Sequence, residues 1–114
     1  MSAPLYHLKA EFFKTLGHPV RIRVLELLSE RERAVAEMLR DTGLEAAYLS
    51  QQLAVLRRAN LVVARREGVT VYYTLTSPRV AELLVVARSI LSGVHADRVA
   101  ELLADLRAGS SPAS

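Results

Sequence analysis

The sequence predicts a mainly α-helical domain with one small β-hairpin. Apolar residues recur at helical spacing through most of the 114 residues, and only 5% of the chain is aromatic. The stretches on both sides of Glu67-Gly68 are instead rich in β-branched and aromatic residues, which indicates strands. A chain of this length is typical of a single domain, and a core of Leu, Val and Ala is typical of packed helices.

The first two helices are separated by a Gly-His-Pro break. Ser2 and Pro4 are expected to open the first helix, which has one broad apolar face. Pro19 suits the first position of the second helix, and His18 is placed to cap it. Because the second helix is apolar on nearly every side, we expect it to be buried in the centre of the domain. A charged connector is predicted from Ser29 to Arg33.

Two further helices follow. A short third helix contains Val35 and Met38 and ends at Gly43. The fourth helix is predicted from Glu45 to Ala59. Asn60 ends it, at a position where a left-handed backbone is needed, because Asn tolerates that conformation best after Gly. Leucines at i, i+4 and i+7 form the buried stripe of the fourth helix, namely Leu49, Leu53 and Leu56.

A hairpin and a long helix complete the domain. The strands are expected over Leu61–Arg66 and Val69–Thr76, with the turn at Glu67-Gly68. Ser77-Pro78 is an N-cap followed by a proline in the first turn of the last helix, in which Gly93 is a point of kinking or division. We expect the domain to span residues 1–108 and residues 109–114 to form a disordered tail.

The segment from Ala46 to Tyr73 holds the charge imbalance of the chain. Its four arginines and one glutamate equal the net charge of +3, and the remaining residues are balanced. Arginine pairs bidentately with phosphate or guanine, so this charge on a helix and a hairpin favours nucleic acid. Of the 15 basic residues of the chain, 13 are arginine. A GC-rich genome, which favours arginine codons, is the alternative explanation for this preference over lysine.

The order of four helices, two strands and a final helix is that of a winged helix-turn-helix. In that fold the fourth helix lies in the major groove. Gln51 is suited to pair with adenine and Ala54 to contact a thymine methyl, whereas the arginines are suited to phosphates. A solvated basic helix is the alternative. The candidate DNA-binding residues are Ala47, Tyr48, Ser50, Gln51, Ala54, Arg57, Arg58, Arg65, Arg66 and Thr70.

Three motifs in register resemble the ArsR/SmtB family of bacterial winged-helix transcriptional regulators. They are LGHPVRIRVL at 16–25, SQQLAVLRRANLV at 50–62, and RREG with VYYTL at 65–75. The resemblance extends from Phe12 to about Leu91. It implies a homodimer with the N- and C-terminal helices at the interface, which binds a palindromic operator and represses transcription. Gln51-Gln52 replaces the family's usual His-His, so the operator sequence cannot be transferred from relatives.

Metal sensing is the best-known activity of the family, and neither of its usual sites matches here. The residues at the positions of those ligands are Ala34, Ala36, Ser77, Arg79, Ile90 and Gly93. A different arrangement of imidazole and carboxylate ligands could draw on His7, Glu11 and His95. We favour surface or capping roles for the histidines, and we expect no cofactor.

Composition excludes several other functions. The absence of cysteine excludes thiolate metal sites, disulfides and thiol redox sensing. No catalytic motif is present, so an enzyme is not expected. No apolar run reaches the ~18 residues of a membrane span, and the N-terminus does not resemble a signal peptide, which predicts a cytoplasmic protein.

The predicted partners are double-stranded DNA and a second copy of the chain. A separate sensor or co-regulator protein is one hypothesis for how binding is switched, including a nickel-responsive pair of which this chain is the DNA-binding half. A small-molecule effector is another. The competing functional class is a protein-interaction module that binds an acidic protein through its basic face.

Overall fold

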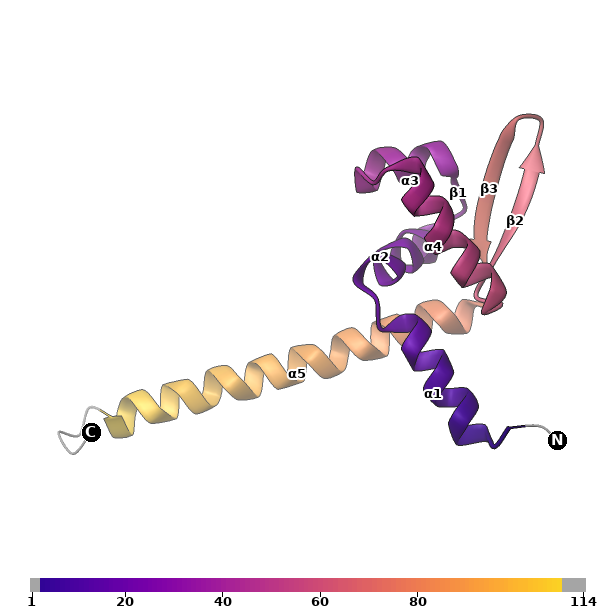
Figure 1. Cartoon of the computed structure of the whole chain (residues 1–114). Helices are drawn as coiled ribbons and strands as arrows, with labels where there is room; N and C mark the ends of the chain where they lie inside the picture. The colour runs from indigo at the N-terminus through magenta and orange to yellow at the C-terminus, as the bar shows by residue number, and fades with distance from the viewer. Residues whose placement is uncertain (1–2, 110–114) are drawn as a thin grey trace. The chain divides into compact units, whose positions relative to one another are not determined.

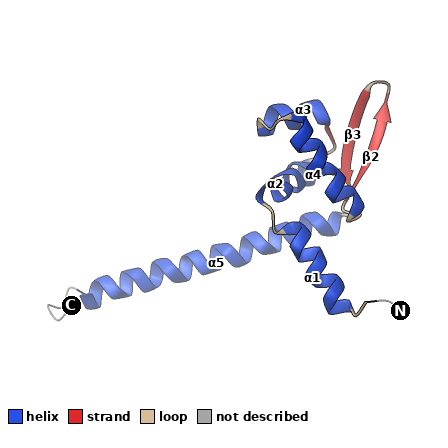
Figure 2. Cartoon of the chain, in the orientation of Figure 1, coloured by secondary structure: helices blue, strands red, loops and turns tan. Residues whose placement is uncertain are grey.

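The computed structural model describes residues 3–109, which form five α-helices and a three-stranded antiparallel sheet (Figures 1 and 2). In chain order the elements are α1 (Leu5–Leu16), α2 (Pro19–Glu30), β1 (Arg33–Ala34), α3 (Val35–Thr42), α4 (Ala46–Arg58), β2 (Val62–Glu67), β3 (Thr70–Leu75) and α5 (Pro78–Gly109). The predicted fold class is confirmed. The chain divides into two compact units, residues 1–81 and 82–114.

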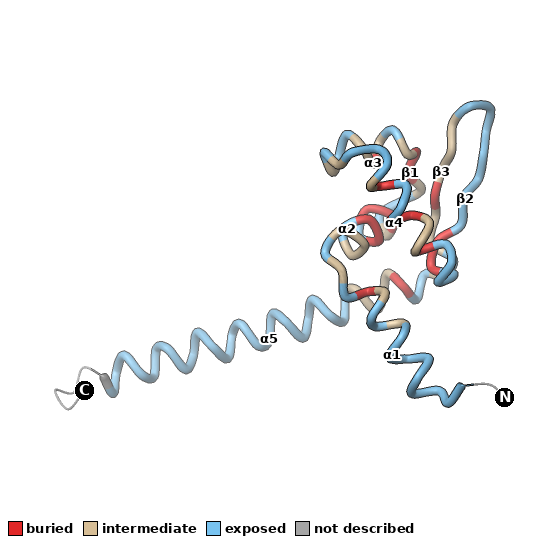
Figure 3. Tube along the Cα trace, viewed as in Figure 1, coloured by how far each residue is buried: buried red, intermediate tan, exposed pale blue. Residues whose placement is uncertain are grey.

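The core of the first unit lies between α2, α3, α4 and the sheet, where the buried segments gather in Figure 3. As predicted, α2 is the central helix, because four of its apolar residues are buried. The leucine stripe of α4 is also confirmed. The fully buried large side chains are Val24, Leu25, Met38, Leu49, Leu56 and Val62.

The residues predicted to begin α2 and to end α4 do so in the structure. His18 caps α2, since its Nδ1 accepts a hydrogen bond from the Val20 N–H at 3.2 Å. Asn60 has a φ of 61°, as expected of the left-handed residue after α4. The next amide, that of Leu61, donates to the carbonyl of Leu56 at 3.0 Å, which is the long bond of a Schellman motif. This turn directs the chain from α4 straight into β2.

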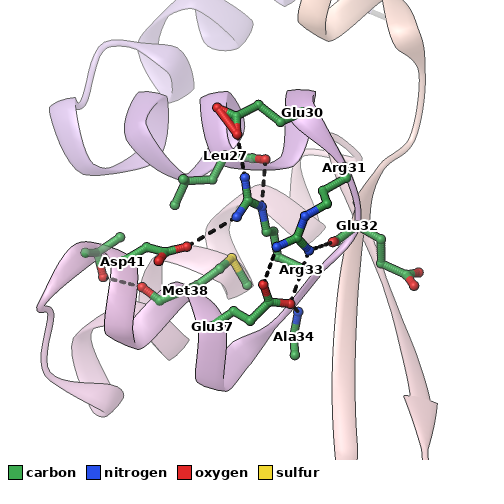
Figure 4. A network of polar contacts seen from close by, with 10 residues as sticks. Leu27, Glu30, Arg31, Glu32, Arg33, Ala34, Glu37, Met38 and Asp41 are labelled. Atoms are coloured by element: carbon green, nitrogen blue, oxygen red, sulfur yellow. Dashed lines mark hydrogen bonds and ion pairs between the residues drawn. The ribbon is translucent and has the colours of Figure 1, made fainter.

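The sheet has the strand order β1-β3-β2. The short strand β1 was not predicted. It begins at Arg33, so the prediction of a charged connector over 29–33 is wrong for its last residue. Arg33 pairs with Tyr73 of β3 and is only 8% exposed. Its guanidinium donates to the Leu27 carbonyl at 3.2 Å and contacts the carboxylates of Glu30 at 2.6 Å and Asp41 at 3.3 Å (Figure 4). This compensation allows a charged side chain to be buried.

The β2–β3 hairpin, called the wing below, turns one residue later than predicted. Glu67 pairs with Thr70, so Gly68 and Val69 form a two-residue turn in place of Glu67-Gly68. Gly68 has a φ of 63°, and only the first turn residue has a positive φ, as in a type II′ turn. The requirement for glycine at that first position sets the register of the hairpin.

The second unit is the continuation of α5. The helix runs from Pro78 to Gly109 without interruption at Gly93, because one glycine costs a helix only ~1 kcal/mol. Gly109 therefore belongs to the helix, and residues 110–114 of the predicted tail lie outside the described residues. Several large apolar side chains of this unit are exposed, namely Val85, Val86, Ile90, Leu91, Val94, Val99, Leu102, Leu103 and Leu106. Between residues 3 and 109, no helix is long and apolar enough to cross a membrane.

Candidate nucleic-acid interface

The outer face of α4, defined by Ala47, Ser50, Gln51 and Ala54, is the first part of the site. These residues fall at i, i+3, i+4 and i+7 and so share one side of the helix. The first three are exposed and Ala54 is half-buried. The Gln51 side chain makes no hydrogen bond within the described residues, so its amide is available to a base edge. The structure therefore brings together four of the predicted contact residues.

Tyr48 lies on the flank of α4 and not on the outer face. Its side chain is half-buried, and its hydroxyl is 3.5 Å from Nε2 of His18 on the α2 side. Gln52 faces further inward and is only 7% exposed. A structural role for Gln52 was not predicted, although this residue lies at i+3 from Leu49 and i−4 from Leu56. That spacing places it within the buried stripe.

A basic end follows the outer face. Arg57 and Arg58 occupy the last turn of α4, and both are exposed. Neither forms an ion pair within residues 3–109. The wing begins four residues later at Val62, because Asn60 reverses the chain. The last turn of α4 therefore carries two positive charges beside the uncharged start of the wing, and the wing arginines follow farther along β2, next to its turn.

Arg65, on the wing, is already bound to two carboxylates. Its guanidinium contacts Glu32 at 2.7 Å and Glu67 at 2.7 Å, and it lies 4.6 Å from the centre of the Tyr72 ring. These hydrogen bonds to Glu32 and Glu67 raise the pKa of Arg65 further above its ordinary value. Glu32 belongs to the segment between α2 and β1, so Arg65 ties the wing to the body of the domain.

Arg66 differs from its neighbour. Successive strand residues point to opposite faces, and Arg66 pairs with Val71 whereas Arg65 pairs with Tyr72. Arg66 is exposed and forms no ion pair in the part of the chain that the structure describes. Thr70, the last predicted contact, pairs with Glu67 beside the turn and is half-buried. Of the two wing arginines, Arg66 alone keeps an uncompensated charge.

A polar network supports α3, the helix that precedes α4 (Figure 4). The Glu37 carboxylate accepts hydrogen bonds from the Arg31 guanidinium and, at 3.2 Å, from the Ala34 N–H. The second bond satisfies the backbone N–H of Ala34, the N-cap residue of α3. Together these bonds lower the pKa of Glu37 to about 2, the Arg31 contact being the larger cause. The start of α3 is thus held by charge-assisted hydrogen bonds.

The candidate metal ligands are not assembled within either unit. Over residues 3–109 there is no group of three or more His, Asp or Glu side chains placed to hold a metal ion. His7 packs edge-on against Tyr6, with ring centres 4.6 Å apart. Glu11 lies one turn further along α1, and His95 belongs to the second unit.

Comparison with known proteins shows similarity to bacterial transcriptional regulators. Residues 18–63 match the family described as bacterial regulatory protein, arsR family. An uncharacterized HTH-type transcriptional regulator of Mycobacterium tuberculosis, Rv0081, is 62% identical over 96% of both chains. Its crystal structure gives a TM-score of 0.80 and covers 86% of this chain and 99% of that one.

Two more distant relatives have known structures or a described role. The biofilm growth-associated repressor of Xylella fastidiosa is 40% identical over 66% of each chain. The homodimeric winged helix-turn-helix DNA-binding domain Mb0332 of Mycobacterium bovis is 31% identical, with a TM-score of 0.70 over 81% of this chain and 91% of that one.

Proposed function

The chain belongs to the ArsR family of bacterial regulatory proteins, and from that membership we propose that it is a homodimeric repressor of a palindromic operator. As a member of this family it is a DNA-binding transcriptional regulator and not an enzyme. The observation that carries the proposal is the outer face of α4, where Gln51 is exposed and unpaired within the described residues beside two free arginines.

Base recognition is assigned to the outer face of α4. Gln51 has the donor and acceptor needed to pair with the N6 and N7 atoms of adenine, and the Ala54 methyl can contact a thymine methyl. Ala47 and Ser50 lie beside them, at the edge of the same face. Tyr48 is bound to the α2 side, so its contribution is confined to the flank of the groove.

Phosphate contacts are assigned mainly to Arg57, Arg58 and Arg66, because their charges are uncompensated. Arg65 would have to exchange a carboxylate for a phosphate, so its contribution is expected to be smaller. Thr70 can donate a hydroxyl hydrogen bond from the same region of the wing. Such contacts position the protein on DNA without reading its sequence.

The homodimer is supported by exposed apolar side chains and by the homodimeric relative. Leu5, Leu8 and Phe13 of α1 are all more than half exposed, and the second unit carries its own exposed apolar residues. Two copies related by a two-fold axis would place their α4 helices in half-sites about one helical turn, ~34 Å, apart. Binding in the cytoplasm across a promoter would then exclude RNA polymerase.

The inducing signal is proposed to act without the family's usual metal ligands, through a small effector or a separate sensor protein. Isothermal titration calorimetry of the dimer with nickel or zinc tests the alternative site drawn from His7, Glu11 and His95. We expect no heat above the dilution background. Stoichiometric binding that is lost in His7→Ala or His95→Ala would contradict this proposal.

Selection of bound genomic fragments, followed by binding measurements, tests the proposed function. The selection should recover a palindromic sequence, which the protein should bind at least a thousandfold more tightly than random duplex. Affinity should fall steeply with salt. A protein-interaction module would instead recover no preferred sequence, and that result would overturn the proposal.

A further inference from the structure

Gln52 is a buried polar residue on a helix whose inner face is otherwise apolar. Within residues 3–109, only Arg33 and Gln52 are polar or charged side chains that are buried. The Oε1 atom of Gln52 accepts a hydrogen bond from Nε of Arg21 at 2.9 Å. An unpaired amide at this position would carry a desolvation cost, and this bond removes it.

Arg21 also contacts a third helix. It belongs to α2, and its Nη1 donates to the backbone carbonyl of Thr15 near the end of α1 at 3.2 Å. The planar guanidinium presents these two donors in a fixed geometry, which a lysine cannot reproduce. One half-buried side chain therefore holds the end of α1 and the inner face of α4 at the same time.

We propose that Arg21 and Gln52 are positioning residues that set the rotation of α4 about its axis and thereby aim Gln51 at the bases. Leu49, Leu53 and Leu56 hold α4 by apolar packing, which has no directional preference. A hydrogen bond is directional and ties one point of the helix to α2. Because adjacent residues of an α-helix are about 100° apart, holding Gln52 inward holds Gln51 outward.

This inference rests on the proposed function and adds a separate prediction about sequence discrimination. Phosphate contacts by Arg57, Arg58 and Arg66 tolerate a small rotation of α4, since they carry no sequence information. Bidentate pairing with a base edge does not, because both hydrogen bonds must be aligned. Loss of the Arg21–Gln52 bond should therefore reduce discrimination between sequences and leave binding to random DNA unchanged.

The test compares two substitutions that break the bond with two that keep it. Gln52→Leu removes the acceptor, and Arg21→Lys removes the planar guanidinium with its two donors. Gln52→Glu keeps an acceptor for Arg21. Arg23→Lys is the matched control, because Arg23 is an exposed residue of the same helix with no hydrogen bond or ion pair in the described range. Each protein is titrated with the duplex recovered from the genomic selection and with a random duplex of equal length.

We express discrimination as the dissociation constant for the random duplex divided by that for the selected duplex. In Gln52→Leu and Arg21→Lys this ratio should fall about tenfold, as expected for a lost hydrogen bond to a charged group. Gln52→Glu and Arg23→Lys should keep the wild-type ratio, and all four should keep the salt dependence on random DNA. Circular dichroism establishes that each variant is folded at the assay temperature. If Gln52→Leu does not fold, the Arg21→Lys and Arg23→Lys pair decides.

Three results would overturn the inference. These are an unchanged ratio in folded Gln52→Leu or Arg21→Lys, an equal loss of affinity for both duplexes, or a loss in Gln52→Glu as large as in Gln52→Leu. A wild-type protein with no preference between the duplexes would instead contradict the proposed function. The two failures are therefore distinguishable in one experiment.

Discussion

The two adjacent arginines of the wing allow a quantitative test of the DNA interface. Arg66 is exposed with no ion pair over residues 3–109, whereas Arg65 is bound to Glu32 and Glu67. Arg66→Ala should therefore reduce the salt dependence of DNA binding. Arg65→Ala should weaken binding to all sequences alike, but by less than Arg66→Ala, and should change the salt dependence little, because that charge is already compensated within the protein.

The size of the expected salt dependence follows from the number of uncompensated arginines. Arg57, Arg58 and Arg66 are the three such residues of the site in each protomer, so a dimer presents six. Six phosphate contacts give a slope of log affinity against log salt of about −5.4, and Arg66→Ala should change it to about −3.6. Between about 50 and 200 mM salt, affinity should fall roughly 1,800-fold for the wild type and about 150-fold for the variant.

Fluorescence anisotropy with a labelled random-sequence duplex at four or more salt concentrations measures both slopes. Random duplex is the appropriate probe because its binding is dominated by phosphate contacts. An unchanged slope in Arg66→Ala, or an equal change in Arg65→Ala and Arg66→Ala, would refute the reasoning. The first result would place Arg66 away from the DNA, and the second would mean that Arg65 leaves its carboxylates on binding.

Three further predictions concern single residues of the first unit. Gln51→Ala should reduce discrimination at one operator position by ~1–3 kcal/mol and leave the salt slope unchanged, as measured with base-substituted duplexes. Glu37→Gln should lower stability at neutral pH, whereas the exposed Glu26→Gln should not. The pKa of Glu37 is lowered from about 4.5 to about 2, so its stabilising effect should be constant above pH 4.5 and disappear as the pH falls through 2. Urea unfolding of both proteins across that pH range measures this effect. Leu49→Ala, at a fully buried site, should cost ~2–5 kcal/mol of unfolding free energy, whereas Val69→Ala at the exposed turn should change it by less than ~0.5 kcal/mol.

Local patterns predicted most of the fold. Helical spacing of apolar residues identified α2 and the leucine stripe of α4, because a helix buries one face through its own periodicity. His18 and Asn60 were predicted as helix boundaries because their roles depend on neighbouring backbone groups. The composition around Glu67-Gly68 predicted the wing, with its turn displaced by one residue, since only the glycine position sets the turn.

The interface was predicted as a set of residues but not as an arrangement. Arg65 and Arg66 are equivalent in sequence, and the structure separates them because Glu32, 33 positions earlier, reaches only one face of the strand. Arg33 was predicted as part of a charged connector, because its pairing with Tyr73 joins residues distant along the chain and β1 is a two-residue strand with no periodicity to detect.

By itself, then, the sequence determined the helices, the wing, the family resemblance and the segment that carries the charge, all of which depend on contacts within a few residues. Tertiary structure decided which arginines are free, which glutamine faces outward and which is bound to Arg21. Those distinctions arise from hydrogen bonds and ion pairs between distant segments, and the packing of α2 against α4 and the wing brings those segments together.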